Sequence, residues 1–173
     1  MGGLALAARV EPRFTRDVDV VVAVGSDDAA ETLVFELGAR GYKVGAIVEQ
    51  EAVGRLSTAR LQSPVGGAVS LFVDLLFASS GIEPEIVRDA DRLEVLPGLH
   101  LPVALVGHLI ALKLLAMNDQ RPQDAFDLEN LRATADGPEL ARAREAIDLI
   151  DVRGFNRGRD LTALFKERIA SEG

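Results

Sequence analysis

The pattern of hydrophobic and polar positions changes part-way along the chain. In the first hundred residues, short apolar or β-branched runs alternate with helical patterns, and beyond them apolar residues recur at three- and four-residue spacing. The predicted strands cover 17–24, 42–48, 55–62, 69–78 and 92–96, with turns at Gly66-Gly67, Pro97 and Pro102. The first predicted helix is capped by Ser26 or Asp27 and runs through 39. The other predicted helices cover 83–89, the region from 105 to 115, a segment starting at 122, 138–150 and 161–169. We therefore predict an α+β fold, with a small mixed sheet over 1–100 and a helical C-terminal subdomain over 101–173 packed on it as one compact unit.

Composition narrows the chemistry. The chain has 173 residues, 48% of them hydrophobic and 27% charged, which suits one globular core. It has no cysteine and two histidines, too few for a zinc site, so any metal must be held by carboxylates. The net charge of -8 disfavours broad nucleic-acid binding. With no signal peptide and no uninterrupted apolar span, we expect a cytoplasmic protein without a membrane partner.

Two aspartates at the start of the first predicted strand are the strongest candidates for chemistry. Asp17 and Asp19 are two residues apart, so a strand would present both on one face. Asp74 interrupts an otherwise apolar strand, where an unpaired carboxylate would be costly to bury. If Asp74 reaches the same face, the three acids could hold two Mg²⁺ ions about 3.5–4 Å apart, as in-line displacement at phosphorus requires. An Asp-x-Asp triplet alone is common by chance.

A pair of glycines precedes these acids. Gly2 and Gly3 would let backbone N–H groups approach a phosphate closely, and a helix starting there would add a favourable positive end. The combination of a glycine pair with three acids indicates phosphoryl-transfer chemistry more strongly than either feature alone.

These motifs resemble the nucleotidyltransferase superfamily that shares its fold with DNA polymerase β. More narrowly, the sequence is similar to the AbiEii-type group, which includes toxins of toxin–antitoxin systems. The matching segments are Gly-Gly-Leu-Ala-Leu from Gly2, Arg-Phe-Thr-Arg-Asp-Val-Asp up to Asp19, Val-Asp-Leu-Leu around Asp74, the helix around Lys113, and Arg-Pro-Gln-Asp-Ala-Phe-Asp-Leu from Arg121 to Leu128. Relatives usually have a helix and a strand before the glycine pair, so we expect either that the sheet lacks an edge element or that the natural start of the chain lies further upstream.

The resemblance implies a function and a site. The chain would transfer a nucleoside monophosphate from a nucleoside triphosphate to an RNA, such as a tRNA end, or to a protein hydroxyl, and an antitoxin would be a partner. Small-molecule acceptors remain open. Two Mg²⁺ ions would bind the acids, and the third acid would activate the attacking hydroxyl. The residues that the resemblance assigns to nucleotide binding are Gly2, Gly3, Lys113 and Asp124, and those it assigns to catalysis and metal binding are Asp17, Asp19 and Asp74. We add Thr15 to the nucleotide-binding group, where we expect it to orient the loop through a backbone hydrogen bond more than to touch the substrate.

Several candidates have simpler interpretations. Lys113 by itself would be a lysine whose stem covers the core while its amine reaches water. Asp127 shares a helix face with Asp124, but acids near a helix start are also dipole partners, and we leave Asp127 out of the site. Gln123 stands where the Arg-x-Lys-Asp version of this motif has a basic residue. Three further groups stay outside the predicted site. Arg13 and Arg16 either hold phosphate or balance the acids, and we interpret the segment with Arg153, Arg157 and Arg159 as a solvated helix connection. We interpret His100 and His108 as structural.

Two other functions use the same acids. Phosphatases of the haloacid dehalogenase type carry Asp-x-Asp, but at the carboxyl end of a hydrophobic strand, whereas here the apolar run follows Asp19. A non-catalytic relative could keep the fold and bind a nucleotide, metal or protein partner.

Overall fold

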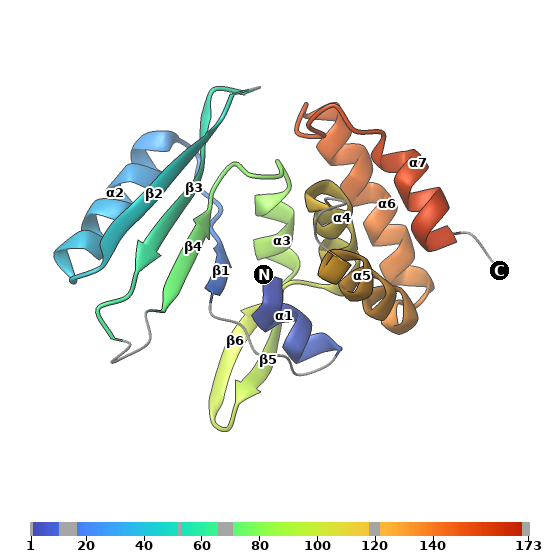
Figure 1. Cartoon of the computed structure of the whole chain (residues 1–173), viewed down its shortest axis with the longest axis horizontal. Helices are drawn as coiled ribbons and strands as arrows, with labels where there is room; N and C mark the ends of the chain where they lie inside the picture. Colours follow the sequence, from blue (N-terminus) through green and yellow to red (C-terminus); the bar gives the residue numbers. More distant parts are fainter. Residues whose placement is uncertain (1, 11–16, 52, 66–70, 118–121, 171–173) are drawn as a thin grey trace.

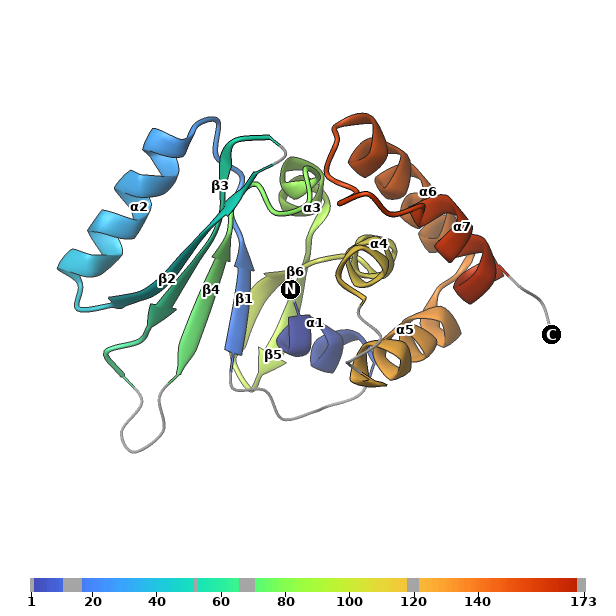
Figure 2. The same ribbon diagram turned by 45° about the horizontal axis from the view of Figure 1, so that its top comes forward.

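In the computed structural model, the chain is described over residues 2–10, 17–51, 53–65, 71–117 and 122–170. Two groups of elements lie side by side in Figures 1 and 2: a sheet with one helix on its outer face, and a group of helices on the other side. The strands are β1 (Asp17–Val21), β2 (Lys43–Gln50), β3 (Arg55–Gln62), β4 (Phe72–Leu76), β5 (Asp91–Leu96) and β6 (Leu99–Val103). The helices are α1 (Gly2–Arg9), α2 (Asp27–Ala39), α3 (Glu83–Asp89), α4 (Val106–Ala116), α5 (Pro122–Thr134), α6 (Gly137–Val152), α7 (Leu161–Phe165) and the π-helix η1 (Lys166–Ala170).

The larger described sheet is mixed and has the strand order β1-β4-β3-β2. Strands β1 and β4 run parallel, whereas β3 is antiparallel to both β4 and β2. The parallel pair needs a long connection, which runs through α2, β2 and β3. As a result, residues 17–21 lie directly beside residues 72–76, although more than fifty positions separate them in the sequence.

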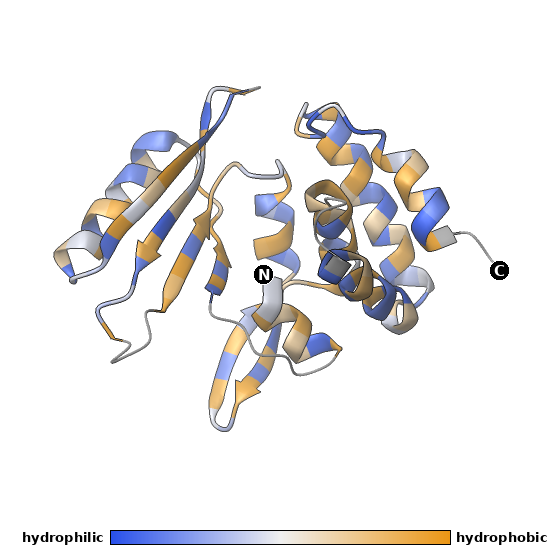
Figure 3. Cartoon of the chain, viewed as in Figure 1, coloured by the Kyte–Doolittle hydropathy of each residue, from blue (hydrophilic) through white to orange (hydrophobic). Residues whose placement is uncertain are grey.

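Helix α2 covers one face of this sheet. Its first turn is fixed by Ser26, whose hydroxyl accepts a hydrogen bond from the N–H of Ala29. Ala30 and Val34 of the helix pack with Leu61 and Leu75 of the strands in a small hydrophobic cluster. Figure 3 shows hydrophobic colour along β4, which is expected of a strand with neighbours on both edges. The opposite face of the sheet is therefore the one turned toward the remaining helices.

The second cluster lies among the helices. It joins buried side chains of α1 and α3 with those of α4, α5, α6 and α7, and Val21 of β1 packs against it. Nine residues of α4 are buried, so this helix has apolar neighbours almost all round. Helix α4 is therefore the centre of the helical half, and it carries Lys113 toward the sheet.

Gly107 permits the close approach of α4 and α6. A Cβ built at Gly107 would overlap the carbonyl oxygen of Glu139 and would lie 2.8 Å from Cβ of Arg142. We expect Gly107→Ala to lower the free energy of unfolding by about 2 kcal/mol, because overpacking forces the two helices apart. Urea unfolding of Gly107→Ala beside Gly137→Ala tests this, since a Cβ at Gly137 meets no atom within 4 Å. Equal stability of both variants would contradict the packing argument.

His108, the next residue of α4, is buried, and its Nδ1 has no hydrogen-bond partner among the described residues. Burial lowers the pKa of His108 below its ordinary 6.5, and the guanidiniums of Arg142 and Arg88 reinforce this, whereas the carboxylates of Asp89 and Glu139 oppose it. The unfolded chain therefore binds more protons than the folded chain as the pH falls below about 6.5, and the stability contributed by neutral His108 is lost in that range.

Acidification should therefore destabilise the wild type more than a variant without this imidazole. Between pH 7.5 and 5.5 we expect the wild type to lose about 1 kcal/mol more than His108→Gln in urea unfolding. His100→Gln is the control, because His100 lies exposed on β6. If the wild type and His108→Gln lost the same stability, the buried neutral histidine would not be the cause.

The structure confirms the α+β fold. The helices predicted over 27–39 and 83–89 and the strand predicted over 55–62 have the expected bounds, and the first strand is shorter, because β1 ends at Val21. The turn predicted at Pro97 is found between β5 and β6. The turn predicted at Pro102 is wrong, because this proline lies within β6. Strands β5 and β6 form a two-stranded sheet, and among the described residues each has one unpaired edge that tolerates a missing N–H. Gly66 and Gly67 lie outside the described residues.

Among the described residues, no helix is both long enough and apolar enough to cross a membrane.

Candidate functional site

The three predicted acids lie on one face of the sheet. Asp17 and Asp19 are alternate residues of β1, and the register of the parallel pair places Asp19 opposite Asp74 of β4. Side chains that are opposite each other, or two residues apart along a strand, point to the same face. Val21 continues this series and packs against the helical cluster, so the acidic face is turned toward the helices and away from α2. The sequence-based expectation that Asp74 joins Asp17 and Asp19 agrees with this register.

Arg60 completes the same row of residues, and sequence reasoning missed it. Arg60 lies on β3 opposite Asp74. Its Nε donates to Oδ1 of Asp74 at 2.8 Å and its Nη2 donates to Oδ2 at 2.7 Å, forming a bidentate pair. The same Nη2 donates to Oδ2 of Asp17 at 3.4 Å. The hydrogen bonds to Asp74, followed by the negative charges of Asp74, Asp17 and Asp19, raise the pKa of Arg60 above its usual value.

Asp19 is the most crowded of the three acids. Burial raises the pKa of Asp19 above its ordinary 3.8, and the nearby carboxylates of Asp74 and Asp17 raise it further. The positive charge of Lys113, on α4, opposes the increase. Asp19 is therefore within electrostatic reach of both the other acids of the sheet and Lys113 of the helical half.

Helix α1 begins against Asp19. Gly2 has φ +63°, and a Cβ built on it would overlap Oδ2 of Asp19 and lie 2.7 Å from its Cγ. A side chain at Gly2 would therefore displace the carboxylate. Gly3 is buried in the first turn of α1. Thr15, Arg13 and Arg16 lie outside the described residues.

Lys113 is held between two carboxylates of α5. Its Nζ lies 2.7 Å from Oδ1 of Asp124 and 2.7 Å from Oδ2 of Asp127. The side chain of Asp127 is only 3% exposed, and Oδ2 of Asp124 has no hydrogen-bond partner among the described residues. Asp127 therefore belongs to this cluster, and its exclusion from the predicted site is wrong. The three-residue spacing of Asp124 and Asp127 on a helix facing Lys113 was the available signal.

Solvent reaches the acidic face. The side chains of Asp17 and Arg60 are 44% and 43% exposed, whereas that of Asp74 is 14% exposed. Beside β1, a pocket of about 370 Å³ is lined by Asp19 and by aliphatic side chains of α1, α3 and β6. Of the three acids, Asp19 therefore borders this pocket, and Asp17 is directly open to solvent.

The acids do not form a ready-made metal site. Within the described residues, no group of three or more His, Cys, Asp or Glu side chains is gathered closely enough to hold a metal ion. The donor chemistry nevertheless suits Mg²⁺, because three carboxylates on one face are hard oxygen ligands. One of these three carboxylates is already engaged, because the guanidinium of Arg60 binds both oxygens of Asp74.

The arginine-rich segment after α6 has a structural role. Arg153 binds the Glu85 carboxylate at 2.9 and 2.8 Å, Arg157 donates to the carbonyl of Ser79, and Arg159 donates to that of Leu114. The segment is the largely exposed connection between α6 and α7 that we expected, and these side chains also attach it to the turn after β4, to α3 and to α4.

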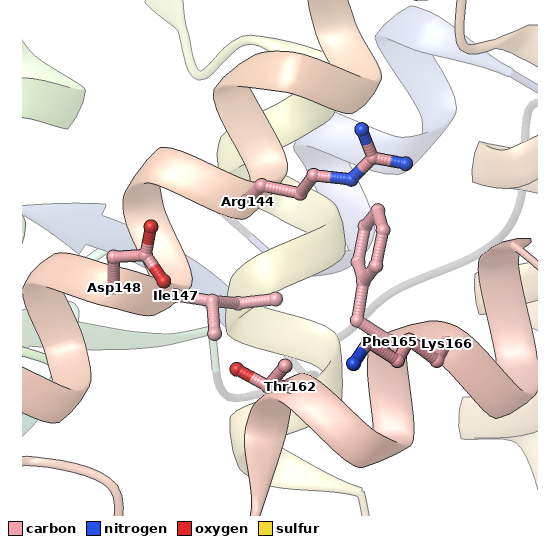
Figure 4. Close-up of a pocket in the computed structure, with 6 residues that line it drawn as sticks. All are labelled: Arg144, Ile147, Asp148, Thr162, Phe165 and Lys166. Atoms are coloured by element: carbon pink, nitrogen blue, oxygen red, sulfur yellow. The ribbon is translucent and has the colours of Figure 1, made fainter.

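A second pocket, between α6 and α7, is shown in Figure 4. It has about 260 Å³ and is lined by both apolar and charged side chains, and the guanidinium of Arg144 lies 5.3 Å from the centre of the Phe165 ring. None of the three acids lines this pocket. We therefore place the candidate site at the acidic face of the sheet.

Comparison with protein families adds an independent observation. Residues 1–171 match the family described as nucleotidyl transferase AbiEii toxin, type IV TA system. The chain belongs to the AbiEii family. Comparison with curated proteins finds no match. The match covers both the sheet that carries the acids and the helices that carry Lys113 and Asp124, so the whole described site lies within the family region.

Membership of the AbiEii family gives the general function. The family consists of nucleotidyltransferase toxins of a type IV toxin–antitoxin system. The alternative of a haloacid dehalogenase-type phosphatase is not supported, because Asp17 and Asp19 begin β1 instead of following it. AbiEii membership also implies a nucleotide substrate and an antitoxin partner.

Proposed function

We propose that this AbiEii-family chain transfers a nucleoside monophosphate from a nucleoside triphosphate to an acceptor hydroxyl. The observation that carries the proposal is the register that puts Asp17, Asp19 and Asp74 on one sheet face, turned toward Lys113. In the reaction, the acceptor oxygen forms a bond to the α-phosphorus, the bond from this phosphorus to the β-phosphate oxygen breaks, and pyrophosphate leaves. Such reactions depend mainly on positioning and on neutralisation of phosphate charge.

Each part of the site has a task in this proposal. Asp17, Asp19 and Asp74 would hold two Mg²⁺ ions, which when bound neutralise the phosphate charge and polarise the α-phosphorus. Asp74 would accept the proton of the attacking hydroxyl. Gly2 and Gly3 would present backbone N–H groups of the first turn of α1 to the triphosphate.

Lys113 would reach the phosphates from α4, with Asp124 and Asp127 orienting its ammonium group. Since both carboxylates already bind Lys113, they partly neutralise its charge and hold its ammonium group in one position. The lysine would therefore contact the phosphates at that position only.

The acceptor would be an RNA, such as a tRNA end, or a protein hydroxyl. The net charge of -8 argues for a confined acceptor site, because an extended RNA surface requires many basic contacts. An antitoxin encoded with the chain would be its regulatory partner, as the family description indicates.

A label-transfer experiment tests the proposal. Wild-type protein and the double variant Asp17→Ala/Asp19→Ala would be incubated with Mg²⁺, each of four α-³²P nucleoside triphosphates, and total cell RNA or protein. We expect label on one class of acceptor with wild type only, from one or a few nucleotides. No transfer from any nucleotide, with both proteins folded by circular dichroism, would favour a non-catalytic binding protein. Equal transfer by the double variant would remove the acids from the mechanism.

A further inference from the structure

Arg60 pairs with one of the three acids that would bind a metal. Three carboxylates and one guanidinium share this face of the sheet, and Arg60 contacts two of the three acids directly. Both oxygens of Asp74 accept from Arg60 at 2.8 and 2.7 Å. An Arg–carboxylate fork of this kind is both strong and directional, so a metal ion cannot take Asp74 as an inner ligand without weakening it.

A second position is open to the Arg60 side chain, beside the ring of Phe72. Its guanidinium carbon lies 5.6 Å from the centre of the Phe72 ring, within the range of a cation–π contact. Phe72 is two residues before Asp74 on the same strand face, and it lies opposite Asp17 in the register. With 43% of its side chain exposed, Arg60 can leave Asp74 while keeping its contact with Phe72. Two arrangements of one side chain are therefore available without a change in the sheet.

We propose that Arg60 is a built-in competitor for the divalent cation: it occupies Asp74 in the metal-free chain and gives this carboxylate up when the cation binds. Arg60 thereby raises the cation concentration that is needed to occupy the site formed by the three acids. The inference rests on the proposed function only in taking Asp17, Asp19 and Asp74 as the metal site. Arg60 is a positioning residue here, since it acts through Asp74.

Direct Mn²⁺ binding provides the test. Free Mn²⁺ would be measured by electron paramagnetic resonance while it is added to wild type, Arg60→Gln and Arg60→Lys, without nucleotide. We expect Arg60→Gln to bind Mn²⁺ about tenfold more tightly than wild type, and Arg60→Lys to lie between them, because an ammonium cannot form the fork. Arg55→Gln is the matched control: it removes the same charge from the same strand, but Arg55 pairs with Asp27.

A second readout follows the guanidinium itself. The Nε–H signal of Arg60, assigned by its loss in Arg60→Lys, should shift in wild type as Mg²⁺ is added, and should not shift in Asp74→Asn. Neither readout needs transfer activity. The inference can therefore fail while the proposed function holds, and the proposed function can fail while the inference holds. The inference would be overturned if folded Arg60→Gln and wild type bound Mn²⁺ with equal affinity, or if Arg55→Gln gained as much Mn²⁺ affinity as Arg60→Gln. It would also be overturned if Arg60→Gln bound no Mn²⁺ at about 10 mM, a concentration beyond the range of weak protein sites.

Discussion

Asparagine in place of Asp19 is expected to abolish nucleotidyl transfer and, at neutral pH, to make the folded chain more stable. The loss of transfer should be about a thousandfold or more, because the variant lacks a carboxylate that neutralises charge through the metal ions. The gain in stability has a separate cause. Asp19 is partly buried beside Asp74 and Asp17, and the ionised carboxylate therefore costs folding free energy.

The pH dependence follows from the direction of the pKa shift. The folded-state pKa of Asp19 lies above the ordinary 3.8, so the folded chain binds more protons than the unfolded chain in the interval between them. Stability is lost as the pH rises through that interval, and Asp19→Asn avoids the loss. We expect a gain of about 1 kcal/mol in urea unfolding at pH 7.5, typical of a relieved functional strain, which shrinks as the pH falls toward 3.8.

The exposed residue Glu36 of α2 supplies the control for Asp19→Asn. Glu36→Gln removes the same charge far from the site and should change neither transfer nor stability by much. A destabilised Asp19→Asn chain at neutral pH would mean that the ionised carboxylate is a net stabilising group, against the crowding argument.

Alanine in place of Gly2 is expected to lower transfer about a hundredfold while the chain still folds. A Cβ at this position overlaps the Asp19 carboxylate, so Asp19 or the start of α1 must shift by about an ångström, and displacements of that size have effects of this order. The readouts are the initial rate of label transfer and the melting temperature.

Backbone strain needs its own control, because Gly2 has a positive φ. Gly54, in the turn between β2 and β3, has φ +58° and no atom within 4 Å of its built Cβ. Gly54→Ala should lose stability comparable to that of Gly2→Ala and keep its transfer rate. Full activity of Gly2→Ala would show that Asp19 tolerates the shift, or that the glycine has no part in the site.

The acids could be found from the sequence because their signal is local. Alternation along a strand decides that Asp17 and Asp19 share a face, and an aspartate inside an apolar run marks Asp74 without knowledge of the fold. The helix bounds could be predicted for the same reason: Ser26 is a cap whose hydroxyl serves the N–H of Ala29, and this depends on neighbours in the sequence.

Arg60 could not be found in that way. Its strand was predicted with the correct bounds, but its role depends on the strand order, which puts β3 beside β4, and on the register, which puts Arg60 opposite Asp74. Both are long-range properties of the sheet, and the hydrophobic pattern of one strand does not specify its partner. The same holds for Lys113 and Asp127, whose contact depends on the packing of α4 against α5.

The division at residue 100 stays a prediction. Strand β6 spans that position, and α1 and α3, from the first hundred residues, pack in the helical cluster. These contacts explain how the acidic face and Lys113 come together: the chain crosses between the two groups of elements more than once.

The most direct test of the central claim compares the fate of two phosphates of one nucleotide. Wild-type protein would receive, in parallel, the preferred nucleoside triphosphate labelled at the α-phosphate and at the γ-phosphate, with Mg²⁺ and acceptor. The account predicts that the α-label becomes attached to the acceptor while the γ-label leaves as pyrophosphate, and that Asp74→Asn stops both. A γ-label on the acceptor, or release of the γ-label as single phosphate, would contradict it.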